Sequence, residues 1–238
     1  MDRNIFAGLI AGLLVLPFAS VVSAKVESGP FAEAEAYFDQ DNEAAVDPAA
    51  GFKLADQLAG QQGAEAVLWR VRVVSRALEA VTSENREQKA IAAWLAKHKD
   101  ELNYSEPSGQ YYLLQAQMWD LYEKYKDTPL AEDFAWEAAT TLLGGECEGY
   151  LPCYTQAELQ SMGRYLELYP RGQFVEFALE DLYWMLEIPS AEEYPLDAND
   201  KAITKEILDR WDKVLAKVPK TEAYRQGLVK IAKEYKLP

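Results

Sequence analysis

Apolar residues recur along most of the chain at the three- and four-residue spacing of an amphipathic α-helix. The strict alternation that is typical of a half-buried β-strand is rare. The pattern therefore predicts an all-α protein from residue 30 onward. The predicted helices cover 30–38, 48–60, 64–81, 84–101, 108–125, 129–143, 156–169, 173–187, 201–218 and 221–236.

Capping and turn residues mark several of the predicted helix ends. Asp47 stands before Pro48, which suits an N-cap followed by a first-turn proline. The segments Thr155–Glu158 and Ser190–Glu193 fit the capping-box pattern at a helix start. Gly144-Gly145 follows a long apolar stretch and predicts a helix stop.

The ends of the predicted helices repeat at a nearly constant offset. The segment 121–132 ends one helix, turns and begins the next, and a similar segment follows 44 residues later at 165–176. A third follows after another 49 residues, at 214–223. Steps of 44 residues backwards from Tyr125 reach Val81 and Tyr37, which end two earlier predicted helices. About five helical hairpins at this spacing predict a solenoid, because each hairpin has to stack on its neighbour to bury its second face.

One of these segments carries a resemblance to a known superfamily. Leu168–Val175, together with Ala178 and Leu179, resembles the Tyr-Pro turn of tetratricopeptide-like repeats, especially those of bacterial envelope proteins. The resemblance implies a right-handed αα-superhelix that binds other proteins. The chain differs from the family because its repeat is longer than the roughly 34 residues of a tetratricopeptide repeat. It also lacks the full Trp/Leu/Gly/Tyr consensus, and no lipid-accepting cysteine follows the N-terminal segment.

The N-terminal segment has the pattern of a secretory signal peptide. Arg3 precedes an apolar run from Ile5 to Phe18, and small residues at the spacing of a cleavage site end at Ala24. The alternative is an uncleaved anchor, for which the run is short, since a membrane span needs about 20 residues. We therefore expect a signal peptide over 1–24, a tetratricopeptide-like helical repeat domain over 25–238, and a periplasmic or secreted protein without stable membrane insertion after cleavage.

The chain has two cysteines, Cys147 and Cys153. In an oxidising compartment a disulfide between them is the default, and the short loop that it closes restrains a single connection. There is no Cys-x-x-Cys-His motif for haem attachment, and no further cysteine or histidine pair that would complete a zinc site. The sequence predicts a structural disulfide and no cofactor.

The formal net charge is −15, from 39 acidic and 24 basic residues. An acidic surface repels phosphate backbones, so we expect no nucleic-acid partner. Two interpretations of the charge stay open: it keeps the protein soluble, or it forms an acidic face for a basic partner.

The search for a catalytic set finds no complete arrangement. His98 is the one histidine, and its charged neighbours at a predicted helix end indicate a solvated position. The carboxylate pairs Glu132-Asp133, Glu180-Asp181 and Glu192-Glu193 would suit glycan hydrolysis, but acids are also favoured in the first turn of a helix. No nucleophile elbow, phosphate loop or metalloprotease motif occurs. We expect no catalytic residues and no enzymatic activity.

Two acidic loops begin like calcium-binding loops. They are Asp39–Glu43 and Asp197–Asp200. The first lacks the glycine and the final acid of an EF-hand loop, where it has Ala44 and Ala50, and the second fails similarly. Both are interpreted as helix-capping loops, and no metal site is expected.

Aromatic residues give the strongest indication of a binding surface. In the predicted helix 108–125, Tyr111, Gln115 and Tyr122 lie on one stripe beside the apolar stripe that faces the core. The first helix of each hairpin lines the concave side of an αα-solenoid, where Tyr and Gln side chains would suit a peptide. The alternative is that the tyrosines are partly buried packing residues. Most of the tryptophans are expected in the core: Trp69, Trp94, Trp119, Trp136, Trp184 and Trp211.

These observations predict an extracytoplasmic interaction or scaffold module without catalysis of its own. Its partner is expected to be a protein or peptide of the cell envelope. Two alternatives stay open. One is a protein that binds or cleaves cell-wall glycan, and the other is a structural subunit of a larger extracytoplasmic assembly.

Overall fold

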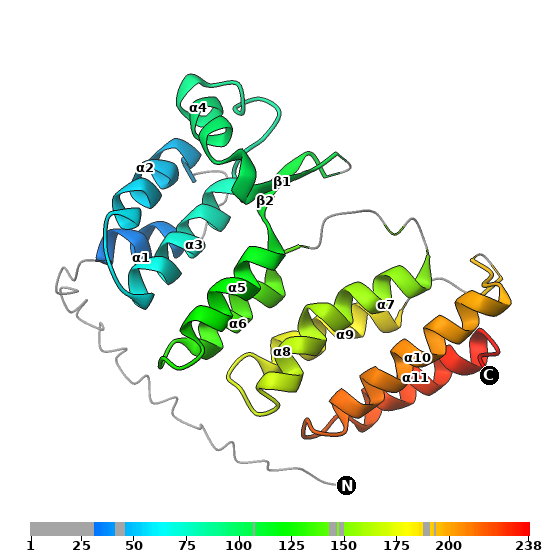
Figure 1. Cartoon of the computed structure of the whole chain (residues 1–238). Coiled ribbons are helices and arrows are strands. Elements are labelled where there is room, and N and C mark those ends of the chain that lie inside the picture. The colour runs from blue at the N-terminus through cyan, green and yellow to red at the C-terminus, as the bar shows by residue number, and fades with distance from the viewer. Residues whose placement is uncertain are drawn as a thin grey trace, which may run out of the picture.

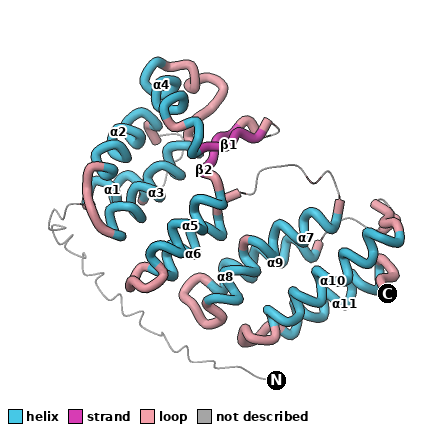
Figure 2. Tube along the Cα trace, viewed as in Figure 1, coloured by secondary structure: helices cyan, strands magenta, loops and turns pink. Residues whose placement is uncertain are grey.

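The structure is a computed structural model that describes residues 31–40, 46–106, 108–142, 147, 150–187, 191–192 and 194–238, without the side chains of Trp184 and Met185. The predicted signal peptide lies outside the described residues, as do Gly144, Gly145 and Ser190. The described part is mainly helical, and its helices lie side by side in a row that runs from α1 to α11 (Figures 1 and 2).

The expected all-α class is confirmed in its coarse form, with one short 3₁₀-helix (η2) and one small sheet added. The elements are α1 (Ala32–Phe38), α2 (Pro48–Ala59), α3 (Ala64–Glu79), α4 (Lys89–Lys97), η2 (Lys99–Glu101), β1 (Leu102–Ser105), β2 (Gln110–Leu113), α5 (Gln115–Tyr125), α6 (Ala131–Thr140), α7 (Leu151–Gln160), α8 (Met162–Leu168), α9 (Val175–Leu186), α10 (Ala198–Leu215) and α11 (Glu222–Glu234).

The sheet is an antiparallel hairpin of β1 and β2, in which Leu102 pairs with Leu113 and Ser105 with Gln110. Gly109 has a φ of 67° in the turn, a value that glycine adopts without strain. The predicted helices 84–101 and 108–125 are therefore wrong at the ends that meet here. α4 ends at Lys97 and α5 begins at Gln115.

Two of the expected helix caps are present. The Asp47 carboxylate accepts a hydrogen bond from the Ala49 N–H at 2.9 Å, with Pro48 in the first turn of α2. The Asp197 carboxylate accepts one from the Asp200 N–H at 2.8 Å, so this acidic loop is the N-cap of α10.

The predicted capping box at Thr155–Glu158 is wrong. Thr155 lies inside α7, which begins at Leu151, and its hydroxyl donates to the Leu151 carbonyl at 2.9 Å. The second predicted box, Ser190–Glu193, begins and ends at residues outside the described part, and the two residues between them are in a turn. The predicted helix 156–169 is also divided, because Ser161 leaves the helical region with a φ of −101° and a ψ of −93°.

Consecutive helices pair into hairpins in the second half of the chain. α5 packs against α6, α8 against α9 and α10 against α11. Neighbouring hairpins also contact each other in series, α6 with α8, α7 and α8 with α10, and α9 with α11. One hydrophobic core runs through the whole set, from Ala34 to Tyr235.

The predicted pairing of 64–81 with 84–101 is not found. α3 packs mainly against α2, and α4 also packs against α2. The reason is aromatic packing, because the Trp94 ring of α4 stacks on the Phe52 ring of α2 with centroids 4.0 Å apart. The 44-residue repeat of helical hairpins, which was expected to continue back to Tyr37, therefore does not extend into the N-terminal helices.

Buried side chains of the second half recur at the offsets read from the sequence. A step of 44 residues and then one of 49 connects buried positions in three successive hairpins. The three sets are Met118, Met162 and Trp211; Tyr122, Leu166 and Leu215; and Ala138, Leu182 and Ile231.

Candidate binding grooves

A groove of about 770 Å³ lies between α5, α7, α8 and α10, and we call it the central groove. Its floor includes Trp119, whose side chain is 6% exposed, and Gly163. A Cβ atom on Gly163 would lie 2.9 Å from the Leu159 side chain and 3.3 Å from the Trp211 ring. Glycine at this position therefore allows α8 to lie close to α10 beneath the groove.

The Trp119 ring is covered by a cation and carries a buried donor. The guanidinium carbon of Arg164 lies 4.0 Å from the centre of the ring, which is a close cation–π contact. The indole N–H of Trp119 is buried and has no hydrogen-bond partner among the described residues. A buried donor without a partner costs free energy in the folded state.

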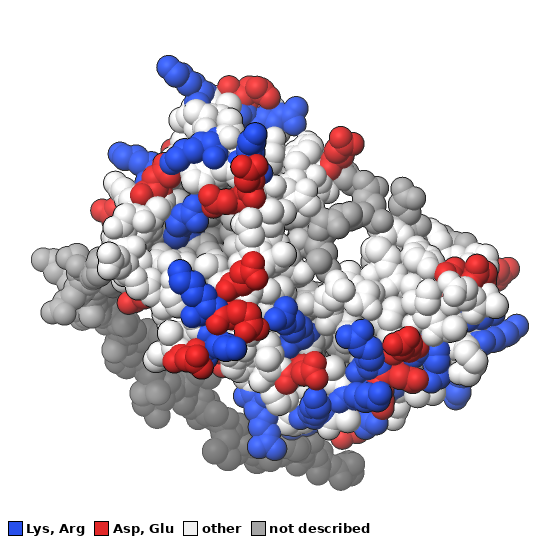
Figure 3. Space-filling model, viewed as in Figure 1, with Lys and Arg blue, Asp and Glu red and all other residues white. Residues whose placement is uncertain are grey.

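The rim of the central groove carries mixed charge. Asp120, Arg164 and Lys213 occupy one repeat position, since they lie 44 and then 49 residues apart. Arg210 is the other cation and Glu167 the other acid of the rim. Figure 3 shows this mixture of acidic and basic side chains over α5, α8 and α10.

Ion pairs tie the first helices of successive hairpins together beside the groove. Arg164 of α8 lies 3.3 Å from Glu123 of α5, and Lys217 lies 3.0 Å from Glu167 of α8. Glu123 and Glu167 are themselves 44 residues apart. Arg210 and Lys213 form no ion pair with any residue that the structure describes, so their charges are available to a ligand.

The structure separates the three residues of the predicted partner surface. Tyr111 lies on β2, not on a helix, and its ring packs 4.7 Å from that of Tyr104. Gln115 is buried in α5, and its amide donates to the Thr141 carbonyl at 3.0 Å. Tyr122 is also buried, at 7% exposure. The three do not share one exposed stripe, and Gln115 alone lines the central groove.

Apart from Gln115, the residues that line the central groove were not predicted from the sequence. Trp119 was expected in the core, and the rim charges were not singled out. The repeat offset would have found them, because applying it to the solvent side of α5 connects Asp120 with Arg164 and Lys213. The tryptophans expected in the core are buried at Trp94, Trp119 and Trp211 and half-buried at Trp69 and Trp136, whereas the Trp184 side chain lies outside the described part.

His98 is buried, at 9% exposure, so the expected solvated position is wrong. The 3₁₀-helix η2 follows directly, and Asp56 of α2 lies 3.6 Å from Nε2 of the ring. The His98 ring stacks on Trp94 at 4.2 Å, and its Nδ1 lies 2.8 Å from Glu101, which also pairs with Arg70 at 3.0 Å. Burial raises the pKa of Glu101, but the hydrogen bonds from His98 and Arg70 outweigh it and the net pKa is lowered.

The first carboxylate pair, Glu132-Asp133, has structural partners. Glu132 accepts hydrogen bonds from the Tyr165 hydroxyl at 2.7 Å and from the Gln173 N–H at 2.5 Å. Asp133 pairs with Arg72 at 2.7 Å. These bonds fix α6 against α8 and α3, which explains why acids stand at these positions.

The second pair is linked to a buried carboxyl. Burial, together with the charge of Asp181, raises the pKa of Glu158 in α7 to about 7. One carboxyl oxygen of Glu158 is buried without a hydrogen-bond partner among the described residues. Neither residue lines the central groove.

The two cysteines are joined, as expected. Cys147 and Cys153 form a disulfide with Cα atoms 5.4 Å apart. The bond connects the first turns of α7 to the segment that precedes it. Nearby, the Tyr150 hydroxyl donates to the Asp200 carboxylate at 2.6 Å, which links this segment to the start of α10.

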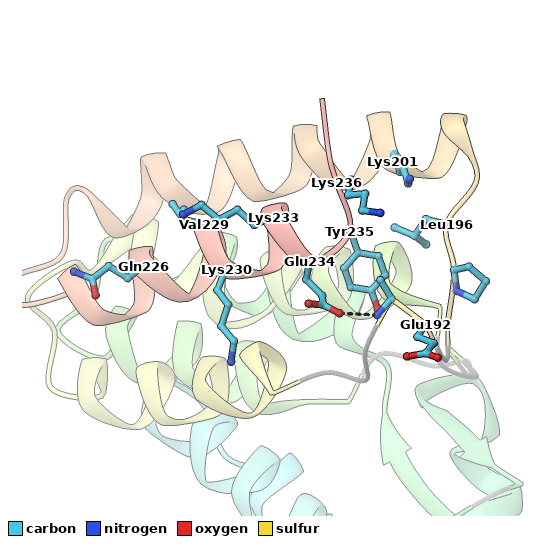
Figure 4. A pocket seen from close by; sticks show the side chains of 12 residues that line it. Glu192, Leu196, Lys201, Gln226, Val229, Lys230, Lys233, Glu234, Tyr235 and Lys236 are labelled. Atoms are coloured by element: carbon cyan, nitrogen blue, oxygen red, sulfur yellow. Dashed lines mark hydrogen bonds between the residues drawn. The ribbon is translucent and has the colours of Figure 1, made fainter.

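A second groove, of about 900 Å³, lies between α11, the start of α10 and the segment before α10 (Figure 4), and we call it the C-terminal groove. Its lining combines cations with apolar side chains and two acids. The cations are Lys201, Lys230, Lys233 and Lys236.

Neither metal binding nor a membrane span is indicated within the described residues. They contain no cluster of three histidine, cysteine or acidic side chains that suits a metal ion. None of the helices in this part of the chain combines the length and the apolar character needed to cross a bilayer. Comparisons with protein families, with curated proteins and with solved structures find no match for this chain.

Proposed function

We propose that this chain is an exported helical-repeat module that binds a segment of a partner polypeptide in the cell envelope, and that the segment lies in the central groove. The main observation behind the proposal is that rim residues of the groove recur at the repeat spacing. Its rim residues Asp120, Arg164 and Lys213 come from one repeat position in three successive hairpins. Repeat proteins bind extended partners in this way, with contacts shared among units.

The chemistry of the groove suits a polypeptide with an acidic side chain. Arg210 and Lys213 are unpaired cations on the rim. A carboxylate of the partner can form an ion pair with them there and lose little of its hydration. Arg164 lies over the buried Trp119 ring, which holds the guanidinium in place at the edge of the groove. Arginine side chains often contribute strongly to binding at protein interfaces.

The architecture proposed for α5 to α11 is a tetratricopeptide-like superhelix, with α5, α7–α8 and α10 on the binding side. The buried positions that recur at 44 and 49 residues support it. Export is supported by the signal-peptide pattern and by the disulfide, which persists in oxidising compartments. The proposal assigns no catalysis to the chain.

Site-specific photo-crosslinking tests the groove. A photo-reactive residue at the exposed Ala116, which lines the central groove, is compared with one at the exposed Ala202 outside it. In an envelope extract we expect a discrete adduct from position 116 and none from 202. The adduct should disappear when Arg210 and Lys213 are both changed to Glu.

A matched variant controls for net charge. Lys89→Glu with Lys99→Glu makes the same change of charge on exposed residues outside the groove and should leave the adduct intact. An adduct of equal strength at both labelled positions, or one that survives the Arg210 and Lys213 changes, would contradict the proposed site.

A further inference from the structure

Cations without partners gather around the C-terminal groove. The ammonium groups of four lysines form no ion pair or hydrogen bond with any residue that the structure describes; they belong to Lys201, Lys230, Lys233 and Lys236. Some lysines of the described part pair with acids, such as Lys205 with Asp209 at 2.5 Å, but these four do not. Together they give one recess four ammonium groups in a chain whose net charge is −15.

The acids of the groove do not neutralise these lysines. Glu234 instead accepts a hydrogen bond from the Ala191 N–H at 3.4 Å, which Figure 4 shows as a dashed line. Glu192 lies on the opposite wall, and neither acid is in an ion pair with a described lysine. The groove therefore keeps an excess of positive charge over its two acids.

The recess between the lysines is partly apolar. Leu196 and Val229 line it, and Val229 is 53% exposed on α11. Tyr235 is buried and forms part of the lining. An exposed apolar side chain surrounded by cations favours a ligand that offers both a hydrophobic group and carboxylates.

We propose that the C-terminal groove is a second binding site, separate from the central groove, and that it takes an acidic peptide segment of a partner protein with an apolar side chain between its carboxylates. The lysines would pair with the carboxylates, while the apolar side chain covers Leu196 and Val229. A short peptide is favoured over a bilayer or a nucleic acid. The rest of the acidic surface repels an extended polyanion, whereas a short segment contacts the recess alone.

Fluorescence anisotropy with a designed peptide tests this site on the full mature chain. The probe is a labelled peptide that alternates Glu with Leu, and the control is the same peptide with Gln in place of Glu. We expect saturable binding of the acidic peptide that weakens as salt is raised, and binding of the Gln peptide that is weaker by about tenfold or more.

Two variants locate the binding. Lys230→Glu with Lys233→Glu should weaken the acidic peptide by about tenfold or more, whereas Lys89→Glu with Lys99→Glu should have little effect. Val229→Asp should also weaken it, because the aspartate repels the carboxylates and removes the apolar contact. Since Lys230, Lys233 and Val229 are exposed on α11, circular dichroism should show that each variant remains folded.

Three outcomes would overturn the proposal. One is equal binding of the Glu and Gln peptides. Another is acidic-peptide binding that is unchanged by the Lys230 and Lys233 substitutions. The third is no peptide binding together with binding to phosphatidylglycerol vesicles that these substitutions abolish, which would assign the lysines to a membrane surface. The central groove is also proposed to take an acidic side chain, so peptide binding that ignores the Lys230 and Lys233 changes but is lost with Arg210→Glu and Lys213→Glu would move the peptide to that groove. The crosslinking test of the central groove uses other residues and can fail independently.

Discussion

Arg72 is the residue on which the contact between α3 and α6 depends most. Its guanidinium is largely buried and lies 2.7 Å from both Asp133 and Glu137. Burial raises the pKa of Glu137 above its usual value, although the pairing with Arg72 acts in the opposite direction. The positive charge of Arg72 therefore balances the negative charges of two partly buried carboxylates.

Removal of that cation should destabilise the fold. Arg72→Met leaves Asp133 and Glu137 without their partner, and we expect the free energy of unfolding to fall by about 3 kcal/mol. Urea denaturation measures the loss. Arg225→Met breaks an exposed pair with Asp212 and should cost less than about 1 kcal/mol, so equal losses from both variants would contradict the argument.

Glu158 should make stability depend on pH. Burial and the charge of Asp181 raise its folded pKa to about 7, from a model-peptide value of about 4.3 in the unfolded chain. The folded state therefore holds the proton more tightly, and this contribution to stability is complete below about pH 4 and lost as pH rises through about 7.

Glu158→Gln removes this dependence because the amide does not ionise. We expect the variant to be more stable than the original chain at pH 8, by about 1–3 kcal/mol, with a smaller difference at pH 5. Thermal or urea unfolding across this range gives the profile. Glu176→Gln changes an exposed acid of α9 and should leave the profile as it was, and parallel profiles for all three proteins would refute the assignment.

At the scale of the elements, the turn between α8 and α9 has side chains packed closely against its glycine, Gly172. A Cβ atom on Gly172 would collide with the Glu132 carboxylate and lie 2.5 Å from the Tyr165 hydroxyl. These two side chains are hydrogen-bonded to each other and to the turn itself. The glycine of the predicted Tyr-Pro turn is thus required by packing between neighbouring hairpins.

Gly172→Ala should lower the free energy of unfolding by about 1–3 kcal/mol, since the added methyl forces these groups apart. Gly60→Ala is the matched change, because its Cβ would be 3.4 Å from the nearest atom and Gly60 has an ordinary helical backbone. We expect it to be neutral or slightly stabilising. Chemical denaturation measures the free energy of unfolding of both variants. If Gly60→Ala were less stable than Gly172→Ala, the turn would not be tightly packed.

The sequence predicted those elements whose pattern is long and periodic. The hairpins from α5 to α11 follow from the repeat, whereas β1 and β2 were missed. The apolar spacing of Leu114, Met118 and Leu121 continues backwards to Tyr111 at a helical interval, so periodicity alone extends the helix too far. The glycine at 109 was the signal for a turn. The burial of His98 was missed because it depends on contacts with Trp94, Glu101 and Asp56, and the last of these comes from a different helix.

At the scale of the whole molecule, serial contact between hairpins should give an elongated particle. A compact chain of this length has a radius of gyration of about 17 Å. Because the hairpins are arranged in a row rather than around one centre, small-angle scattering of the mature chain should give a clearly larger value. A radius at the compact limit would show that the row closes on itself in solution.

The three residues of the predicted binding surface do not share one helix face, for a reason that belongs to this scale. Tyr111, Gln115 and Tyr122 were grouped on one helix, but the central groove between helices takes two to four residues from each of four helices. Residues far apart in the sequence, such as Trp119 and Arg164, come into contact because the hairpins stack. The apolar pattern of a single helix holds no information about that stacking. The repeat offset is the one part of the sequence that carries such information.

That offset has an implication for how the protein changes over evolutionary time. Because Asp120, Arg164 and Lys213 stand at equivalent positions of the repeat, duplication of one 44-residue unit would lengthen the proposed ligand footprint by one further side chain. Specificity would then diverge by point mutation at that position alone, while the buried copies such as Met118 and Met162 preserve the stacking.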